Sequence, residues 1–327
     1  MKLIINGEQV WHPMIKAAEI ALTLQRTGKV IIDLHGEAPS LEETPMIELF
    51  DYLKSQGLDI TKIQVLTGNP LETYSEVSVK FVPTSFYEFP LFQKYKDSIP
   101  THKSIKYHFG NFVSRTTMPR LIFASHLYTK YKDKTFQTFH YRYDNDYHKT
   151  HLELDKLVNE YGPLSPEFNE AVNLLKSSPL LKEEIMSYPI LHTDRPTIVN
   201  PCQWYPDFFL DVICETWPNH NGFYITEKFW RAVATKTPFV IYGPRHVLTN
   251  LKKIGFKTFH DFWDEGYQED YSVDKITGIK DILKKLSAEP LDEIAWMYRN
   301  MQPILDHNYE VFMNFTFKDL EKIKVGL

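Results

Sequence analysis

The chain has 327 residues, of which 43% are hydrophobic and 24% are charged, and its formal net charge is −5. This length suits one large or two medium α/β domains, and the apolar fraction fills a sizeable core, which excludes a disordered chain. The sequence contains no Gly- or Ser-rich linker and no repeat at solenoid spacing.

The apolar runs of the sequence are short. The start, MKLIINGEQVW, has a run of only three apolar residues, and no window approaches the roughly 18 that a membrane span needs. The two cysteines, Cys202 and Cys214, form no C-x-x-C pair, which favours a reducing compartment. We therefore expect a cytoplasmic protein without a membrane span.

Three series of strands and helices follow one another along the chain. The first predicts a strand at 29–34, a helix at 41–56 and a strand at 61–67, which is the unit of a parallel sheet. The second predicts a strand and loop at 104–114, a helix at 119–131 and a strand at 135–143, followed by mostly helical residues at 152–188. The third predicts strands at 207–216, 238–243 and 256–259, helices at 226–236 and 245–255, and a closing helix at 291–323. Two Rossmann-like lobes with a ligand site outside the carboxyl ends of their strands are expected.

The helix at 226–236 begins with a charged motif. Thr226 suits the N-cap, and Glu227 in the first turn agrees with the helix dipole, whereas Lys228 opposes it. A diphosphate bound at the helix N-terminus would resolve this conflict, and so would a pairing of Lys228 with an acidic side chain. Glu215 at the end of the preceding strand faces the same crevice, where it and Glu227 could accept hydrogen bonds from sugar or ribose hydroxyls; solvated loop carboxylates are the alternative.

The run DFFLDVICETWPNHNGFYITEKFWRAVATKTPFVIYGP resembles the donor-binding region of α-1,3-fucosyltransferases. Tyr224, Ile225, Thr226, Glu227 and Lys228 match that family's motif letter for letter, and Glu215 stands where the family has Glu. Thr216 stands where the family usually has Asn, which leaves the donor sugar open. The following residues resemble fucosyltransferase-like proteins common in phages and marine bacteria.

The resemblance implies a GT-B fold and an inverting, metal-independent glycosyltransferase that uses a nucleotide-sugar as substrate, linked to UDP or GDP, and needs no cofactor. Residues 1–102 would form the acceptor lobe, 103–300 the donor-binding lobe, and 301–327 a helix that packs back toward the first lobe. Glu227 and Lys228 would contact the ribose and diphosphate of the donor, and Glu215 would lie near the donor sugar. Thr216, Tyr224 and Thr226 are further candidates for donor binding.

Further site residues follow from position. NFVSRTTMPRLIFASHLY resembles the first strand, loop and helix of the donor lobe, where Arg115 and Arg120 are candidates for the donor phosphates. Inversion needs a general base, and the loop after the strand at 29–34 offers Asp33 first, Glu37 second and His35 third; turn or capping roles are the alternative.

Two other patterns bear on ligands. Asp144-Asn145-Asp146 has the D-x-D form with which other glycosyltransferases hold a divalent metal, although such clusters also make turns; His246 and His260 have no metal-ligand spacing. Residues 94–151 hold eleven Lys and Arg against four Asp and Glu, interleaved with aromatic residues, which suits a phosphate-bearing partner or a solvated helix face.

Three functions fit these patterns. The first is an inverting glycosyltransferase with a glycan acceptor. The second is a phage-type DNA glycosyltransferase that modifies hydroxymethylated cytosine and tracks DNA through residues 94–151. The third is a non-catalytic protein that binds a nucleotide-sugar or a glycan on the same fold.

Overall fold

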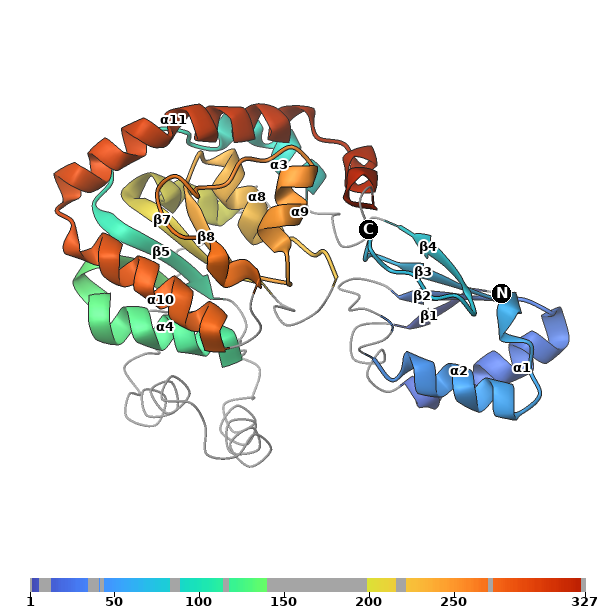
Figure 1. The fold of residues 1–327 in the computed structure, drawn as a ribbon. Helices are drawn as coiled ribbons and strands as arrows, with labels where there is room; N and C mark the ends of the chain where they lie inside the picture. The colour runs from blue at the N-terminus through green and yellow to red at the C-terminus, as the bar shows by residue number, and fades with distance from the viewer. Residues whose placement is uncertain are drawn as a thin grey trace.

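The computed structural model describes residues 2–5, 13–34, 41, 44–82, 89–113, 118–139, 199–215, 222–269 and 273–324. Figure 1 shows two parts, each built on a sheet, which we call the first and the second lobe. Both sheets are wholly parallel, so the α/β class predicted from the sequence is confirmed.

The first lobe contains a four-stranded sheet whose strands follow in chain order. Its strands are β1 (Lys2–Ile5), β2 (Val30–Leu34), β3 (Ile63–Thr67) and β4 (Ser78–Phe81). Helices α1 (Ala17–Thr27) and α2 (Met46–Ser55) lie on the same face of this sheet (Figure 1). That placement follows from right-handed crossovers that each step in the same direction. Among the described strands the order β1-β2-β3-β4 contains no reversal, and these four strands therefore form no topological switch point.

The second lobe contains a sheet with a reversal of strand order. Its strands are β5 (Tyr107–Val113), β6 (Thr135–Phe139), β7 (Phe208–Cys214) and β8 (Phe239–Tyr242), arranged β6-β5-β7-β8. The chain steps outward from β5 to β6 and then returns to the other side of β5 for β7 and β8. This is the order of doubly wound sheets, whose ligands bind outside the carboxyl ends at the switch point. Here the switch point lies between β5 and β7.

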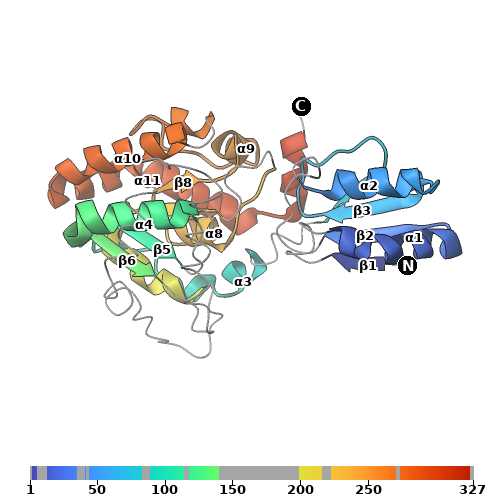
Figure 2. The same ribbon diagram turned by 90° about the horizontal axis from the view of Figure 1, so that it is seen from below.

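Helices cover both faces of the second sheet, as Figures 1 and 2 show. They are α3 (Phe89–Lys94), α4 (Met118–Tyr131), α8 (Glu227–Ala234), α9 (Val247–Lys253), α10 (Val273–Ala288) and α11 (Leu291–Asn314). Helices α4 and α10 lie on one face, and α8 and α11 lie on the other (Figure 1). Short 3-10 helices connect the elements at Pro13–Lys16, Ile60–Lys62, Lys96–Ser98, Lys132–Lys134, Asn200–Asp207, Gly266–Glu269 and Phe317–Lys324.

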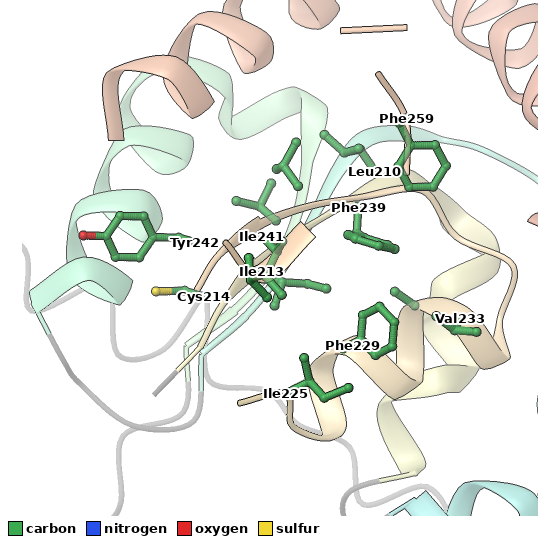
Figure 3. Packing of buried hydrophobic residues seen from close by; sticks show 14 of the residues in the cluster. Leu210, Ile213, Cys214, Ile225, Phe229, Val233, Phe239, Ile241, Tyr242 and Phe259 are labelled. Carbon is green, nitrogen blue, oxygen red and sulfur yellow. The ribbon is translucent and has the colours of Figure 1, made fainter. Parts of the chain in front are cut away.

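The core of the second lobe is rich in aromatic side chains. All seven residues of β7 are buried, and Figure 3 shows Phe229 and Val233 of α8 packed beside Phe239 and Ile241 of β8. The sheet packs so closely that a Cβ atom on Gly110 would overlap the ring of Phe208. Close packing of this kind fixes β7 and α8, and with them the side chains at their ends.

Some boundaries differ from those expected. Phe89, Phe92 and Ile99 pack in the core of the second lobe, although the expected boundary placed residues up to 102 in the first. The C-terminal helix ends at Asn314 rather than near 323, because Phe315 is extended and a 3-10 helix follows. That last segment lies between the two lobes in both views (Figures 1 and 2), and its Leu320 and Ile323 belong to the second core.

Candidate functional site

The candidate site lies at the carboxyl ends of β5 and β7. Helix α4 follows β5 and helix α8 follows β7, so two helices on opposite faces begin near the switch point. Three charged side chains from these elements are buried there: Glu215 directly after β7, Lys228 in the first turn of α8, and Arg120 in the first turn of α4. Buried charges in proteins are paired, so their partners define what this site can do.

Glu215 is the most deeply buried of the charged residues. Its side chain has no exposed surface, and its carboxylate accepts hydrogen bonds from the backbone N–H of Thr226 (3.0 Å) and from the Thr226 hydroxyl (2.7 Å). The Glu215 backbone N–H continues the sheet by donating to Tyr242 O of β8 (2.9 Å). Glu215 therefore ties the end of β7 to the start of α8.

Thr226 is the N-cap of α8, as the sequence predicts. Its backbone is extended, and its hydroxyl oxygen accepts from the Lys228 backbone N–H (3.4 Å) and from the Lys228 ammonium (2.9 Å). The cap thus satisfies a backbone donor of the first turn while its own N–H and O–H are satisfied by Glu215. Tyr224, two residues earlier, is also buried.

The structure identifies the negative partners of Lys228. Its ammonium lies 3.0 Å from Glu227 Oε1 and 3.7 Å from Glu215 Oε2, and Arg231 Nη2 lies 3.9 Å from the same Glu227 oxygen. Of the two resolutions that the sequence allowed, the pairing with acidic side chains is the one present in the chain itself. A bound anion would share Lys228 with these carboxylates.

Burial and charge shift the two carboxyl groups in opposite directions. Desolvation raises the pKa of Glu215, although Lys228 and the hydrogen bonds from Thr226 act against the shift. Burial also acts to raise the pKa of Glu227, but Lys228 and Arg231 together hold that pKa well below its usual range. Perturbed carboxyl groups beside a strand end are typical of functional sites and also of structural ion pairs.

Arg120 connects α4 to the same strand end. Its Nε donates to Cys214 O (3.3 Å), and only 2% of the residue is exposed. Cys214 itself is a buried thiol whose pKa is raised to about 12, mainly by burial, so it is an inert core residue. Two other candidate donor residues, Arg115 and Thr216, lie outside the described residues.

In the first lobe, Asp33 lies near the carboxyl end of β2. The strand extends one residue beyond Asp33, to Leu34, and the Asp33 side chain is buried, with 3% of the residue exposed. The two other base candidates, His35 and Glu37, lie outside the described residues. The structure thus places one of the three, close to the edge that the sequence predicted.

Two residues of the site were not found from the sequence. Arg231 stands four residues after Glu227 on α8, a spacing that could have indicated the pair. Asn69 follows β3 of the first lobe, yet its Oδ1 accepts from the Phe223 backbone N–H (3.2 Å), just before α8. Sequence spacing gives no sign of that contact, because 154 residues separate the two partners.

Three of the described lysines in the basic segment lie at the far edge of the second sheet. Lys106 directly precedes β5, and Lys132 and Lys134 precede β6, so all three sit at the amino ends of parallel strands. Seven residues of β5 separate that edge from the carboxyl ends, roughly 23 Å at about 3.3 Å per residue. Residues 140–151, with Asp144 and Asp146, lie outside the described residues.

The described part of the chain lacks two general features. It contains no group of three or more His, Cys, Asp or Glu side chains that could hold a metal ion. None of its helices combines the length and the apolar character needed to cross a membrane.

Fold and site together define an α/β protein with two parallel sheets and a buried charged cluster at the carboxyl edge of the second. No family model, curated protein or solved structure matches the chain. The function must therefore be argued from the site.

Proposed function

We propose that the protein is an inverting glycosyltransferase of the GT-B type, which transfers a sugar from a nucleotide-sugar to the hydroxyl of a glycan acceptor. The observation that carries the proposal is the position of the Thr226-Glu227-Lys228 motif, with Glu215, at the switch point of the second sheet. Ligands of doubly wound sheets bind at this point, and helix N-termini favour anionic groups. The likeness of residues 207–244 to fucosyltransferase donor regions supports the same assignment.

In this proposal the donor diphosphate lies between the N-termini of α4 and α8. Lys228 and Arg120, at the ends of these helices, stabilise the negative charge that grows on the departing diphosphate. Glu227 accepts hydrogen bonds from the ribose, while Glu215 fixes Thr226 and hence the first turn of α8.

The first lobe supplies the general base. Asp33, Glu37 or His35 takes the proton from the acceptor hydroxyl while its oxygen attacks the anomeric carbon. The bond to the diphosphate oxygen breaks on the opposite side of that carbon, which inverts its configuration. The contact of Asn69 with Phe223 brings the segments after β3 and before α8 together. This contact supports a site in which the first lobe activates the acceptor and the second lobe binds the donor.

A glycan acceptor is favoured over DNA by the position of three described lysines of the basic segment. Lys106, Lys132 and Lys134 lie at the edge of the sheet opposite to the proposed donor site. DNA bound along them would be roughly 23 Å from the transferred sugar, at about 3.3 Å per strand residue. DNA modification would thus depend on basic residues of 94–151 other than these three.

The test is a thermal-shift panel of UDP, GDP, CMP and dTDP sugars against the wild type, Lys228→Ala and Lys236→Ala. Lys236 lies at the other end of α8, where it pairs with Asp306, and is the matched control. A ligand at 100 times its Kd should stabilise the protein by about 2.7 kcal/mol. We expect one nucleotide class to shift the wild type and Lys236→Ala, but not Lys228→Ala, each relative to its own unliganded midpoint.

Two other outcomes of this panel would change the function that we assign. If no nucleotide shifts the wild type, the glycosyltransferase proposal is wrong. If a nucleotide-sugar binds but is neither transferred nor hydrolysed, the chain is a non-catalytic nucleotide-sugar-binding protein on the same fold.

A further inference from the structure

Hydrogen bonds of Asn69 to residues before and after it fix the turn that follows β3. The Asn69 backbone N–H donates to the Thr67 hydroxyl (3.1 Å), and Asn69 Oδ1 accepts from the Leu71 backbone N–H (3.0 Å). Glu72 N–H then donates to Asn69 O (3.3 Å). Local bonds of this kind fix the side chain of Asn69 before it makes any contact outside its own lobe.

The same side chain reaches the second lobe. Asn69 Oδ1 also accepts from the Phe223 N–H (3.2 Å), and a Cβ atom on Gly222 would lie 2.8 Å from Asn69 Nδ2. Asn69 is only 4% exposed, and Phe223 is fully buried in the second core. Leu71 packs against that core as well, so the turn is docked on the second lobe by both polar and apolar contacts.

A second polar side chain of the turn makes its contact within the first lobe. Glu72, which is 6% exposed, accepts at Oε2 from the Leu41 backbone N–H (2.8 Å). Leu41 is the described residue that follows the loop after β2. The turn therefore contacts chain segments from both halves of the proposed site.

We infer that Asn69 is a positioning residue, which holds the segment from Gly222 to Thr226 in place from the first lobe and so couples the acceptor lobe to the donor-binding helix. The segment it holds ends at Thr226, whose N–H and hydroxyl are bound by Glu215. Release of Phe223 would therefore loosen the N-cap of α8. The role of this coupling in catalysis rests on the proposed function, whereas the contact itself does not.

The test measures hydrogen exchange of the Phe223 amide in the full-length protein without ligand. Asn69→Ala removes the acceptor and should speed exchange by about fivefold or more, the effect of losing one buried hydrogen bond. Asn69→Asp keeps an Oδ1 acceptor and should exchange close to the wild-type rate. Asn308→Ala is the matched control, since Asn308 is equally buried and its Oδ1 accepts from Lys257 N–H (2.7 Å) within the second lobe.

Gly222→Ala probes the same contact from the other lobe. Its Cβ displaces Asn69, so it should also speed exchange at Phe223, and adding Asn69→Ala should have little further effect. Unchanged exchange in both single variants, or an equal increase in Asn308→Ala, would overturn the inference. This variant also keeps the test decisive if Asn69→Ala does not fold.

Ligand binding separates this inference from the proposed function. If a nucleotide binds the wild type, its Kd should rise at least threefold in Asn69→Ala and stay unchanged in Asn308→Ala. A normal Kd in Asn69→Ala despite fast exchange would refute the coupling to the donor site. Failure of every nucleotide to bind the wild type would refute the proposed function alone, because exchange at Phe223 is measured without ligand.

Discussion

Replacing Lys228 by Met should destabilise the protein by leaving a buried carboxylate without its cation. Glu215 has no exposed surface, and its Oε2 lies 3.7 Å from the Lys228 ammonium. At an effective dielectric constant of about 20, the attraction over such a distance is on the order of 4 kcal/mol. Removing one partner of a buried pair costs about 3–5 kcal/mol in measured cases. We expect about 3 kcal/mol at pH 8, because Thr226 still donates two hydrogen bonds to Glu215.

The assay is a double-mutant cycle by urea unfolding, with Lys228→Met, Glu215→Gln and the double variant. Glu215→Gln keeps an acceptor for Thr226 and should cost about 1 kcal/mol, the value of an ordinary hydrogen bond. The double variant contains no uncompensated buried charge and should be more stable than Lys228→Met alone. Lys236→Met is the control, because Lys236 pairs with Asp306 at the surface, where such pairs contribute about 0–1 kcal/mol.

Two results would refute this reasoning. If Lys228→Met costs no more than Lys236→Met, Lys228 does not compensate a buried charge. If the two single effects simply add in the double variant, Glu215 and Lys228 are not coupled, and the pair is not what fixes the start of α8.

Three further predictions concern pH and packing. The pKa of Glu227 is lowered, so the stabilising effect of its carboxylate is present above its unfolded pKa of about 4.3 and is lost as the pH falls toward the folded value. Glu227→Gln should remove this acid dependence of the free energy of unfolding. An unchanged dependence of that free energy on pH would contradict the prediction. Burial raises the pKa of Asp211 to about 7, so the contribution of Asp211 to stability is fully present below its unfolded pKa of about 3.9 and declines up to about pH 7. Asp211→Asn, which keeps an acceptor for the Tyr205 hydroxyl (2.7 Å), should flatten that decline in urea unfolding from pH 5 to 8, and an equal decline would contradict the shift. Gly110→Ala should destabilise by about 1–3 kcal/mol through overpacking, and a wild-type midpoint in thermal unfolding would show that the sheet has room for a Cβ.

The sequence predicted the elements that carry continuous apolar runs. β7 was found although Asp211 interrupts its run, because the flanking residues are apolar and all seven residues are buried. α1 was missed because apolar Leu22 is exposed within it and apolar Met14 and Ile15 are exposed in the 3-10 helix just before it, which blurs the helical periodicity of the buried face. β4 was missed because it is a four-residue edge strand with alternating exposure.

The predicted strand at 256–259 is wrong for a different reason. Its alternation of Phe and polar residues is typical of a strand, and Phe256 and Phe259 are indeed buried. The backbone N–H groups, however, are taken by side chains: Lys257 N–H donates to Asn308 (2.7 Å) and Phe259 N–H donates to Glu265 (2.7 Å). Side chains outside residues 256–259, one of them 51 residues away, thus take the place of a neighbouring strand, and the four-residue pattern carries no information about them.

The charged cluster sets a condition on any anion that binds at this site. Lys228 is already shared between Glu227, Glu215 and the Thr226 hydroxyl, and Arg231 also faces Glu227. A diphosphate that recruits Lys228 must therefore weaken the contact of Lys228 with Glu227, whose carboxylate keeps Arg231 as a second cation. Glu215 is less able to compensate for such a loss, because it is fully buried and Lys228 is the one cation described within 4 Å of it. If a donor binds as proposed and moves Lys228, its effect would therefore reach the end of β7 through Glu215 as well as α8.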